Sequence, residues 1–278
     1  MRNNSLLIKL DLTRGGAISF ISKTDEKRNL VNIHDEGRYI QQSYYAGKRL
    51  DRQDEGQSPR WSPWTWNPIQ VGDAYFNRAQ ILASEIKGNT VYTQCIPMLW
   101  DMNNKPAEAI MEQWTTLEDN VIKVKNKLTC QRTDTLYGEG MKRSQELPAV
   151  YPISSLSELY SYVGEKPFTK GPMKKLEVKF LQNGFWGRYQ NGEITESWMA
   201  FVDQNNWGMA VYSPSTQSFL AGMSGRPGGE AESGSTSYIA PVKKVALYKN
   251  SVFEYEYYII IGQLEEMRET IYDIQSKN

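Results

Sequence analysis

Histidine and cysteine are scarce in this chain of 278 residues, which has one of the former and two of the latter. The single histidine, His34, excludes a metal site built from several imidazoles, and neither an HExxH motif nor a Cys–His spacing occurs. We therefore expect no metal and no cofactor. Cys95 and Cys130 are too few for a disulfide scaffold, and we expect two buried thiols; a bridge between neighbouring strands stays open.

An excess of charge is also lacking, since 32 basic residues are balanced by 32 acidic ones. A neutral chain has no long-range field to attract nucleic acid or an anionic membrane. No apolar run approaches the roughly 20 residues that a membrane span needs. The first residues lead directly into an alternating run without an export signal. We expect a secreted or periplasmic protein whose signal was removed; a cytoplasmic location and the oligomeric state stay open.

Alternation of apolar and polar residues recurs along most of the chain and predicts an all-β fold. Short turns between the strands favour a large antiparallel β-sandwich that forms one domain over residues 1–278. A short C-terminal helix is expected at 263–275, where Leu264, Met267, Ile271 and Ile274 share a face. Strands are predicted at 6–12, 17–22, 38–45, 79–86, 90–100, 110–117, 121–132, 176–181, 198–203, 207–212, 237–247 and 252–261.

Three stretches, 48–73, 138–165 and 224–237, are too irregular to be predicted as strands, and loops of this length are usually functional or mobile. The last of them is rich in glycine but lacks the GxxxxGK[ST] order, so nucleotide binding is not expected. We interpret it as a surface loop that could cover a site.

Aromatic residues are plentiful, with eight Trp and 17 Tyr, and some of these rings are expected to face a ligand. Several tryptophans stand close together on the Pro-rich stretch 48–73. Indoles stack on the apolar faces of sugars while neighbouring polar groups bind the hydroxyls. We predict that Trp64 and Trp66 are sugar platforms assisted by Asn67, Gln70 and Asp73. The alternative is a loop that its tryptophans pin to the core.

The predicted strand at 38–45 is polar on both faces. Arg38, Gln42 and Tyr44 share one face, and Tyr45 lies on the other. Guanidinium, amide and phenol groups suit the hydroxyls and carboxylates of sugars, so these residues are candidates for substrate binding. The alternative is a solvated edge strand that carries a row of tyrosines.

Carboxylates could supply acid–base chemistry, and glycoside hydrolysis needs two of them about 5–10 Å apart. The candidates are Asp73, Glu112, which shares a predicted strand with Trp114, and Glu146. We favour Glu146, because its apolar neighbours could raise its pKa toward that of a general acid. His34 is expected to be a turn residue without a catalytic role, and no GxSxG elbow accompanies it.

The opening Thr13-Arg-Gly-Gly-Ala-Ile-Ser-Phe-Ile resembles an early strand of galactose-mutarotase-like proteins. This resemblance implies a β-supersandwich, the fold of aldose epimerases, of polysaccharide lyase domains and of some glycoside hydrolases. The stretches 38–47, 66–73, 145–152, 162–168 and 196–214 resemble bacterial secreted proteins thought to act on glycans. The epimerases share a pair of catalytic histidines and a glutamate, whereas this chain has only His34, so epimerase activity is disfavoured.

Three functions fit these features, each with an oligo- or polysaccharide as partner. The leading hypothesis is a glycoside hydrolase in which Glu146 and Asp73 form the carboxylate pair. The second is a polysaccharide lyase that acts on a uronic acid, in which Tyr44 or Tyr45 removes a proton while Arg38 and Gln42 neutralise the substrate carboxylate. The third is a noncatalytic carbohydrate-binding module.

Overall fold

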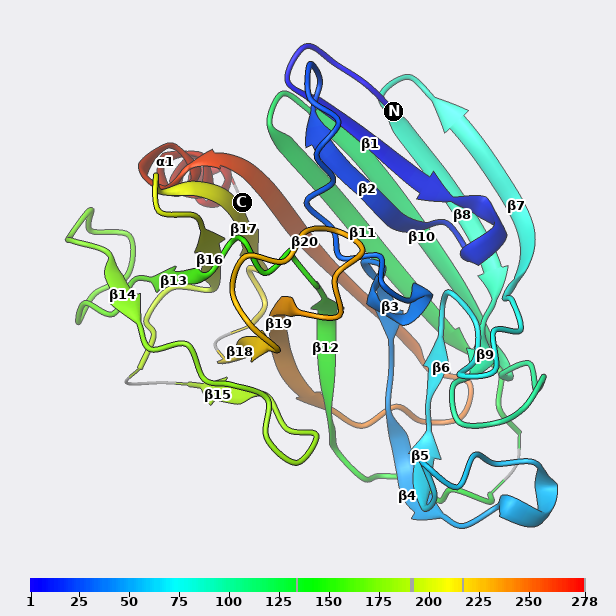
Figure 1. Ribbon diagram of the computed structural model, residues 1–278. Helices are drawn as coiled ribbons and strands as arrows, with labels where there is room; N and C mark the ends of the chain where they lie inside the picture. Colours follow the sequence, from blue (N-terminus) through cyan, green and yellow to red (C-terminus); the bar gives the residue numbers. More distant parts are fainter. Residues whose placement is uncertain (134, 191–192, 217, 278) are drawn as a thin grey trace.

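The computed structural model describes residues 1–133, 135–190, 193–216 and 218–277, and two stacked antiparallel sheets form the main part of its architecture (Figure 1). Within these residues the larger sheet has nine strands, in the order β14-β13-β16-β17-β20-β11-β10-β8-β7. Their bounds are β7 Gln80–Lys87, β8 Thr90–Ile96, β10 Ala109–Glu118, β11 Val121–Cys130, β13 Glu158–Ser161, β14 Lys174–Leu176, β16 Trp198–Val202, β17 Trp207–Tyr212 and β20 Val252–Gln263.

The smaller sheet has seven described strands, in the order β15-β18-β19-β12-β3-β6-β9. They are β3 Gln41–Ser43, β6 Pro68–Ile69, β9 Met98–Leu99, β12 Arg143–Ala149, β15 Gly187–Tyr189, β18 Ser218–Ser224 and β19 Thr236–Val245. Two hairpins complete the β-structure, one from β1 Leu6–Asp11 and β2 Ala17–Lys23, the other from β4 Ala46–Leu50 and β5 Trp64–Trp66. Single 3-10 turns occupy Leu12–Arg14, Glu36–Arg38 and Gln53–Glu55.

The core lies between the sheets, because strands of the larger sheet turn one apolar face inward. In β10, Met111 and Leu117 are buried, whereas Glu112 and Trp114 point to the opposite face. Each aliphatic side chain buried in this way contributes about 1.5–3 kcal/mol. The predicted all-β sandwich is therefore confirmed, and the two-residue period of β8, β10 and β11 reflects one buried face in each of these strands.

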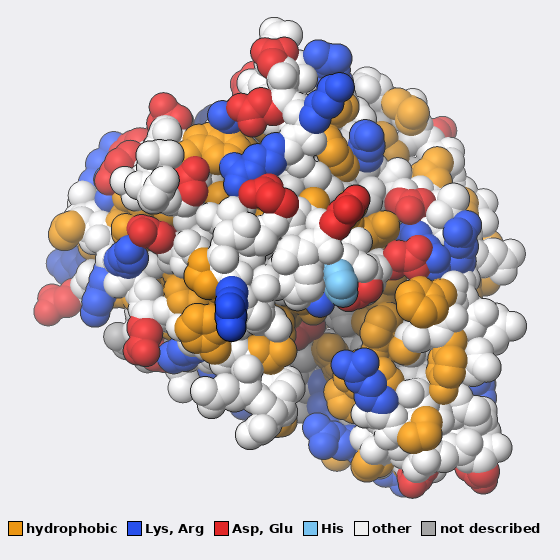
Figure 2. All heavy atoms as spheres, viewed as in Figure 1, with side chains coloured by type: hydrophobic (Ala, Val, Ile, Leu, Met, Phe, Trp, Pro, Cys, Tyr) orange, Lys and Arg blue, Asp and Glu red, His pale blue; other side chains and the backbone are white. Residues whose placement is uncertain are grey.

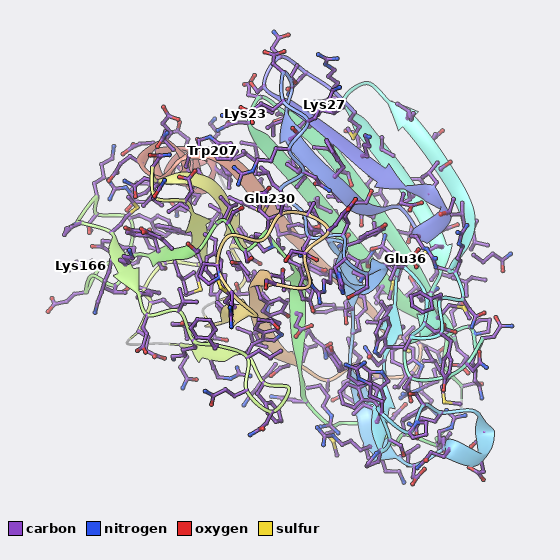
Figure 3. The ribbon with its side chains drawn as sticks, viewed as in Figure 1. Lys23, Lys27, Glu36, Lys166, Trp207 and Glu230 are labelled. Carbon is purple, nitrogen blue, oxygen red and sulfur yellow. The ribbon has the colours of Figure 1, made fainter. Side chains whose placement is uncertain are left out.

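The β1–β2 hairpin covers part of the larger sheet beside the smaller one (Figure 1). Leu6, Ile8 and Ile21 join the same buried cluster as the strands of the two sheets. At the end of β2 the ammonium of Lys23 lies 4.3 Å from the centre of the Trp207 ring on β17 (Figure 3). These contacts fix the hairpin, which carries the residues of the resemblance, onto the sandwich.

The predicted C-terminal helix is confirmed as α1, Leu264–Ser276. A capping box between Gln263 and Glu266 begins the helix, since each side chain accepts a hydrogen bond from the backbone of the other residue. Its apolar face packs on the outer face of the larger sheet, where Met267 and Ile271 join a cluster with Ile260. Among the described residues, α1 included, no helix has the length and apolarity needed to cross a membrane.

The predicted strand at 38–45 is wrong in its bounds. A 3-10 turn ends at Arg38, and the strand β3 spans only Gln41–Ser43. The side chains of Gln41 and Gln42 do not alternate between a core and solvent, and both are buried. Their amides pair with backbone groups of neighbouring segments, so the polar pattern reflects buried hydrogen bonds rather than an exposed edge.

Other expectations about individual segments also need correction. The stretch 48–73 contains β5 and β6, and the stretch 138–165 contains β12 and β13. The predicted strand at 176–181 is wrong, because β14 ends at Leu176. Strand β18, Ser218–Ser224, was not predicted. The strand predicted at 90–100 is interrupted at Pro97, which cannot donate to a ladder, and forms β8 and β9.

Both cysteines are buried thiols that are not bridged to each other, as expected. Cys95 on β8 pairs with Met111, and Cys130 on β11 pairs with Ala109, so β10 separates the two thiols. Burial raises the pKa of the Cys95 thiol to about 12, so this thiol stays protonated at neutral pH. Both side chains are part of the core.

Candidate functional site

A cavity of about 420 Å³ opens on the outer face of the smaller sheet, the face turned away from the larger sheet. Strand β12 forms its floor, the β4–β5 hairpin borders one side, and the segment before β15 borders the other. In the surface view, hydrophobic and basic side chains surround a recess just below the single histidine (Figure 2). We call this space the Glu146 cavity, after the carboxylate at its floor.

Glu146 is half-buried on β12, with Val242 of β19 and Ser43 of β3 directly opposite it in the ladder. Its neighbours Gln145 and Leu147 point into the sandwich, so the strand alternation turns the carboxylate outward. Its Oε2 accepts a hydrogen bond from the Tyr45 hydroxyl at 3.4 Å. Desolvation raises the pKa of Glu146 above its usual value, which makes the carboxylate a stronger base than one in water.

Tyrosines surround this carboxylate. Burial, together with the negative charge of Glu146, raises the pKa of Tyr45 and of Tyr238 well above 10. The same two causes raise the pKa of Tyr151. All three phenols therefore keep their protons at neutral pH, and each is a potential proton or hydrogen-bond donor.

Aromatic rings form two walls of the cavity. On one side Trp64 lies 5.3 Å from the Trp61 ring and 6.4 Å from the Tyr45 ring, centre to centre. On the other side Trp186 stacks on Tyr238 with ring centres 4.3 Å apart. Phe185 precedes it and is 72% exposed. Such rings offer flat apolar surfaces to the C–H faces of a sugar.

The charge of the cavity is positive. Arg49, Arg143 and Arg188 line it, and Glu146 is the one carboxylate among the described lining residues. Arg143 donates two hydrogen bonds to the carbonyl of Gly47, at 2.9 and 2.7 Å, which fixes its guanidinium. Desolvation and the nearby charge of Arg49 lower the pKa of Arg143. Burial is the larger of these causes, and the like charge of Arg49 adds to it.

The structure brings three predicted residues together at this cavity: Glu146, Tyr45 and Trp64. A fourth, Asn67, is buried beside it, where its Oδ1 accepts a hydrogen bond from the Trp64 indole at 3.0 Å and its Nδ2 donates to the Tyr44 carbonyl at 2.7 Å. Asn67 therefore holds the ring of Trp64 in place and does not face the cavity.

Four predicted contacts with a ligand are wrong, because the side chains are buried inside the sandwich. Tyr44 is 0% exposed, and its hydroxyl donates to Gln42 Oε1 at 2.8 Å. Gln42 in turn donates to the Glu112 carbonyl, and Gln70 Nε2 donates to Gly15 and to Gln113. Trp66 is also 0% exposed and lies against the Arg132 guanidinium.

Asp73 stabilises its own loop. Its Oδ1 accepts hydrogen bonds from the backbone N–H groups of Tyr75 and Asn77, at 2.9 and 3.0 Å. Its Oδ2 accepts from the Asn77 amide and from the Asn104 backbone, at 2.9 and 2.8 Å. A carboxylate with four donors in place is a structural group, and we correct the pairing of Asp73 with Glu146 accordingly.

Arg38 and His34 lie near the Gly-rich loop, outside the lining of the Glu146 cavity. Arg38 pairs with Asp35 at 2.9 Å and donates to the Gly234 carbonyl at 3.1 Å. His34 Nδ1 lies 3.1 Å from the Glu232 carbonyl. Both side chains therefore hold residues 232–234 to the segment before β3, where Arg38 has no free fork for a substrate carboxylate.

Glu112 and Trp114 lie on the outer face of the larger sheet, far around the fold from β12. Glu112 pairs with Lys127 at 2.7 Å and accepts from the Tyr92 hydroxyl at 3.0 Å. Trp114 contacts the Tyr92 ring at 5.1 Å. These residues form a cross-strand surface cluster and do not join the cavity.

Sequence reasoning missed the second aromatic wall and the arginines. A signal for the wall exists, because Asn183-Gly184 is a typical hairpin turn and Phe185-Trp186 follows it directly. Both turn residues have positive φ, 52° and 79°, as such a turn requires. Arg49, Arg143 and Arg188 carry no comparable signal, since they come from three segments that only the fold brings together. Among the described residues, no cluster of three or more histidine, cysteine or acidic side chains could hold a metal ion.

Neither a family model nor a curated protein sequence matches the chain. Solved structures match its fold. A galactose mutarotase related enzyme from Lactobacillus acidophilus aligns with a TM-score of 0.56 and 10% identity, over 94% of this chain and 96% of that chain. A galactose mutarotase-like protein from Lactobacillus casei aligns with a TM-score of 0.54 and 12% identity, over 94% of this chain and 98% of that chain.

A larger enzyme also contains this fold. An alpha-N-acetylgalactosaminidase from Bifidobacterium bifidum, in complex with GalNAc, aligns with a TM-score of 0.52 and 10% identity, over 99% of this chain and 39% of that chain. At such identities these likenesses show the fold alone. The chain has the galactose-mutarotase-like β-supersandwich fold, as the resemblance of its opening residues predicted.

Proposed function

We propose that this protein is an enzyme that acts on a saccharide chain bound in the Glu146 cavity, with Glu146 as the group that transfers a proton. The observation that carries the proposal is a half-buried carboxylate of raised pKa between two aromatic walls. Proteins of the same fold include a mutarotase-related enzyme and a glycosidase solved with a sugar bound, which supports a saccharide as ligand.

The reaction class that the lining residues support best is β-elimination. Hydrolysis by the usual route needs a second carboxylate about 5–10 Å from the first, and Asp73 does not provide one. Elimination from a uronic acid needs one base, one acid and positive charge near the substrate carboxylate. Glu146, Tyr45 and Arg143 line one cavity and match these three roles.

The steps follow from the proton affinities of the two groups. Ionised Glu146 removes the proton from the carbon that bears the uronate carboxylate, and that electron pair forms a C=C bond as the C–O bond to the next sugar breaks. The leaving oxygen takes the proton of the Tyr45 hydroxyl. The proton on Glu146 then passes to the Tyr45 phenolate across their 3.4 Å contact, which restores both groups.

Tyr45 acts in this scheme as the acid and not as the base. Its pKa lies well above 10 because it is desolvated next to a carboxylate, so a phenolate base at neutral pH would be costly. Arg143 and Arg49 stabilise the charge that develops on the uronate when its neighbouring carbon loses a proton. Trp64 and Trp186 hold the apolar faces of the sugars.

The test is an activity screen on neutral and uronate polysaccharides with two readouts, absorbance of a new C=C bond and release of reducing ends. Elimination gives both signals, whereas hydrolysis gives reducing ends alone and would overturn the reaction class. Glu146→Gln should abolish turnover in either case. Saturable binding with no turnover on any substrate of the screen would show a noncatalytic binding module.

A further inference from the structure

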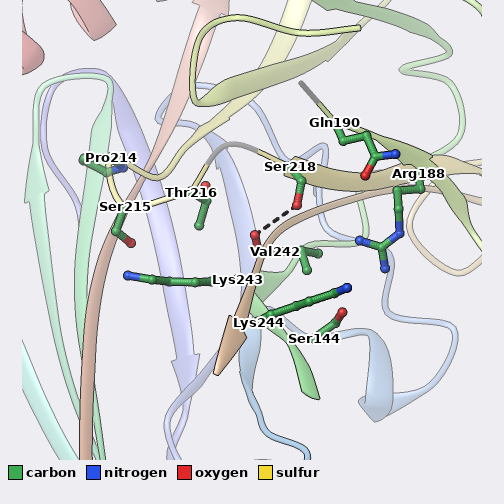
Figure 4. A pocket seen from close by; sticks show the side chains of 10 residues that line it. All are labelled: Ser144, Arg188, Gln190, Pro214, Ser215, Thr216, Ser218, Val242, Lys243 and Lys244. Atoms are coloured by element: carbon green, nitrogen blue, oxygen red, sulfur yellow. Dashed lines mark hydrogen bonds between the residues drawn. The ribbon is translucent and has the colours of Figure 1, made fainter. Parts of the chain in front are cut away.

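A second cavity, of about 800 Å³, adjoins the Glu146 cavity on the same sheet. Its lining includes Arg188, Lys243 and Lys244, with Ser144 and Ser218 between them (Figure 4). Ser144 and Arg188 line both cavities, so the two spaces are adjacent. We call this second space the basic groove.

Strand pairing places the basic groove in line with Glu146. In the β12–β19 ladder Glu146 is opposite Val242, and Ser144 is opposite Lys244. Residues opposite each other share a face of the sheet, and so do residues two apart along a strand. Lys244 therefore projects from the same face as Glu146, displaced along the strands by two residues, or about 7 Å.

Two of the three basic side chains of the groove, Arg188 and Lys244, point toward each other (Figure 4). The Lys244 ammonium points toward the Arg188 guanidinium, with the Ser144 hydroxyl beside Lys244, whereas Lys243 points to the opposite side, toward Ser215 (Figure 4). Arg188 is brought to this place by β15, whose ladder with β18 puts Arg188 opposite Leu220, a residue of the Glu146 cavity. The two cations thus stand at the junction of both spaces.

No acid compensates this charge. Among the described residues, none of Arg49, Arg143, Arg188, Lys243 and Lys244 forms an ion pair, and the lining of the basic groove contains no carboxylate. The lysines of β11 on the larger sheet, by contrast, each pair with a glutamate of a neighbouring strand, as Lys123 does with Glu256 at 2.9 Å. Clustered cations without counter-charges repel each other, and an anionic ligand relieves this repulsion.

We infer that the basic groove is a subsite for a second anionic group of the glycan, so that the ligand is a polyanionic saccharide with acidic groups on more than one of its sugars. The chain runs from the Glu146 cavity over Arg188 toward Lys244. The orientation of the chain rests on the proposed function; the recognition of anionic groups rests on the groove itself. A carboxylate and a sulfate ester share the chemistry that the groove would bind.

Binding of defined polymers tests this inference. We would measure the affinity of the Glu146→Gln variant, in which turnover is blocked, for polygalacturonate, alginate, hyaluronan and chondroitin sulfate. Each polymer is paired with its carboxyl-reduced form, and desulfated chondroitin separates sulfate from carboxylate recognition. We expect at least one acidic polymer to bind and its carboxyl-reduced or desulfated form to lose at least tenfold in affinity, with binding that weakens as salt is raised.

Single-charge variants locate the subsite. Lys244→Ala should weaken binding of that polymer about five- to tenfold, the size expected for one charge-assisted contact at a partly exposed site. Lys87→Ala removes a lysine of β7 on the other sheet and is the matched control, expected to change affinity less than twofold. Equal effects of the two variants, or equal binding of acidic and neutral polymers, or no binding of any acidic polymer, would overturn the inference.

The outcomes separate the subsite from the proposed function. Binding of acidic polymers with a Lys244 effect, but without turnover by the unmodified protein, contradicts the proposed reaction and leaves the subsite standing. If the protein turns over a neutral glycan and Lys244→Ala does not change that turnover, the result supports a saccharide enzyme and contradicts the anionic subsite.

Discussion

The outer faces of the two sheets carry basic residues in different ways. On the larger sheet, Lys123, Lys125 and Lys127 project from alternate positions of β11, and each pairs with a glutamate of a neighbouring strand at 2.7–2.9 Å. On the smaller sheet the cations line two adjacent cavities that contain one carboxylate among their described lining residues, Glu146. The lysines of β11 are thus neutralised within the protein, whereas the cations of the smaller sheet have no paired acid among the described residues, which agrees with the proposed anionic ligand.

The aromatic residues differ in the same way. Trp114 on the larger sheet is half-buried against Tyr92 and the Lys125 ammonium, within a regular cross-strand pattern. Trp64 on the smaller side stands at the rim of a cavity, and a buried amide, Asn67, fixes its ring. An orienting hydrogen bond of this kind is typical of a side chain whose position matters for binding. This difference supports the proposal that the smaller sheet carries the binding site, while Trp114 belongs to the surface packing of the larger sheet.

The strongest test of this comparison uses a glutamate on each face. Glu146→Gln removes the carboxylate that accepts the substrate proton, at nearly constant shape, and turnover should fall about 10²- to 10⁴-fold. Glu112→Gln removes an ion pair of the larger sheet, and turnover should stay within twofold while stability falls by about 1 kcal/mol or less. Turnover and melting temperature are measured for both. A drop below about tenfold for Glu146→Gln would remove it from proton transfer.

The next largest effect concerns Trp66, which the sequence alone does not distinguish from Trp64. Its ring is fully buried beside Arg132, so Trp66→Ala should destabilise the protein by about 3–5 kcal/mol through the cavity that it leaves. The measurement is chemical denaturation. A loss of stability under 1 kcal/mol, accompanied by weaker glycan binding, would show that Trp66 contacts the ligand and is not only a core residue.

Trp64→Ala should behave in the opposite manner. Glycan binding should weaken by about 1–3 kcal/mol, the usual loss for an aromatic anchor, with a smaller effect on the melting temperature. Trp114→Ala is its counterpart on the larger sheet and should leave binding unchanged. Calorimetric titration with a substrate from the activity screen compares the two. If both variants bind equally well, the aromatic wall of the Glu146 cavity has no part in recognition.

The parts of the fold that could be predicted are those with one buried face. β10 and β11 alternate because every second residue faces the core, and α1 repeats its apolar residues for the same reason. β12 hides this pattern. It carries polar residues in its first half and then Pro148, which cannot donate to the ladder, and its register shifts between Glu146 and Ala149.

The direction of the Glu146 pKa shift could be predicted from its neighbours in the sequence. Which polar and aromatic side chains are buried could not, because tertiary contacts determine it. The apolar sequence around Glu146 indicated a raised pKa, and the structure gives that direction. Gln42 and Gln70 were wrongly predicted to face a ligand, because a polar sequence does not distinguish buried side chains from exposed ones. Both are buried, and the backbone N–H of Gln42 donates to Gln70 Oε1. Whether a tryptophan of Trp64-Thr-Trp66 faces solvent depends on Arg132 and on β4, which lie far away in sequence.

The smallest expected effect is a pH dependence of the free energy of unfolding that comes from Glu146 on the smaller sheet. Burial raises the pKa of Glu146 in the folded state, so the folded protein holds this proton more tightly than the unfolded chain. Its contribution to stability is therefore fully present below the unfolded pKa and is lost as the pH rises through the folded pKa. Gln cannot ionise, so Glu146→Gln should remove this loss, and the stability difference between variant and parent should shift in favour of the variant from about pH 4 toward pH 7. Denaturation at a series of pH values measures it, with Glu112→Gln, on the other sheet, as the control. If the difference in unfolding free energy between Glu146→Gln and the parent does not change with pH, Glu146 is hydrated like a surface carboxylate. That result would contradict its role as a base of raised proton affinity.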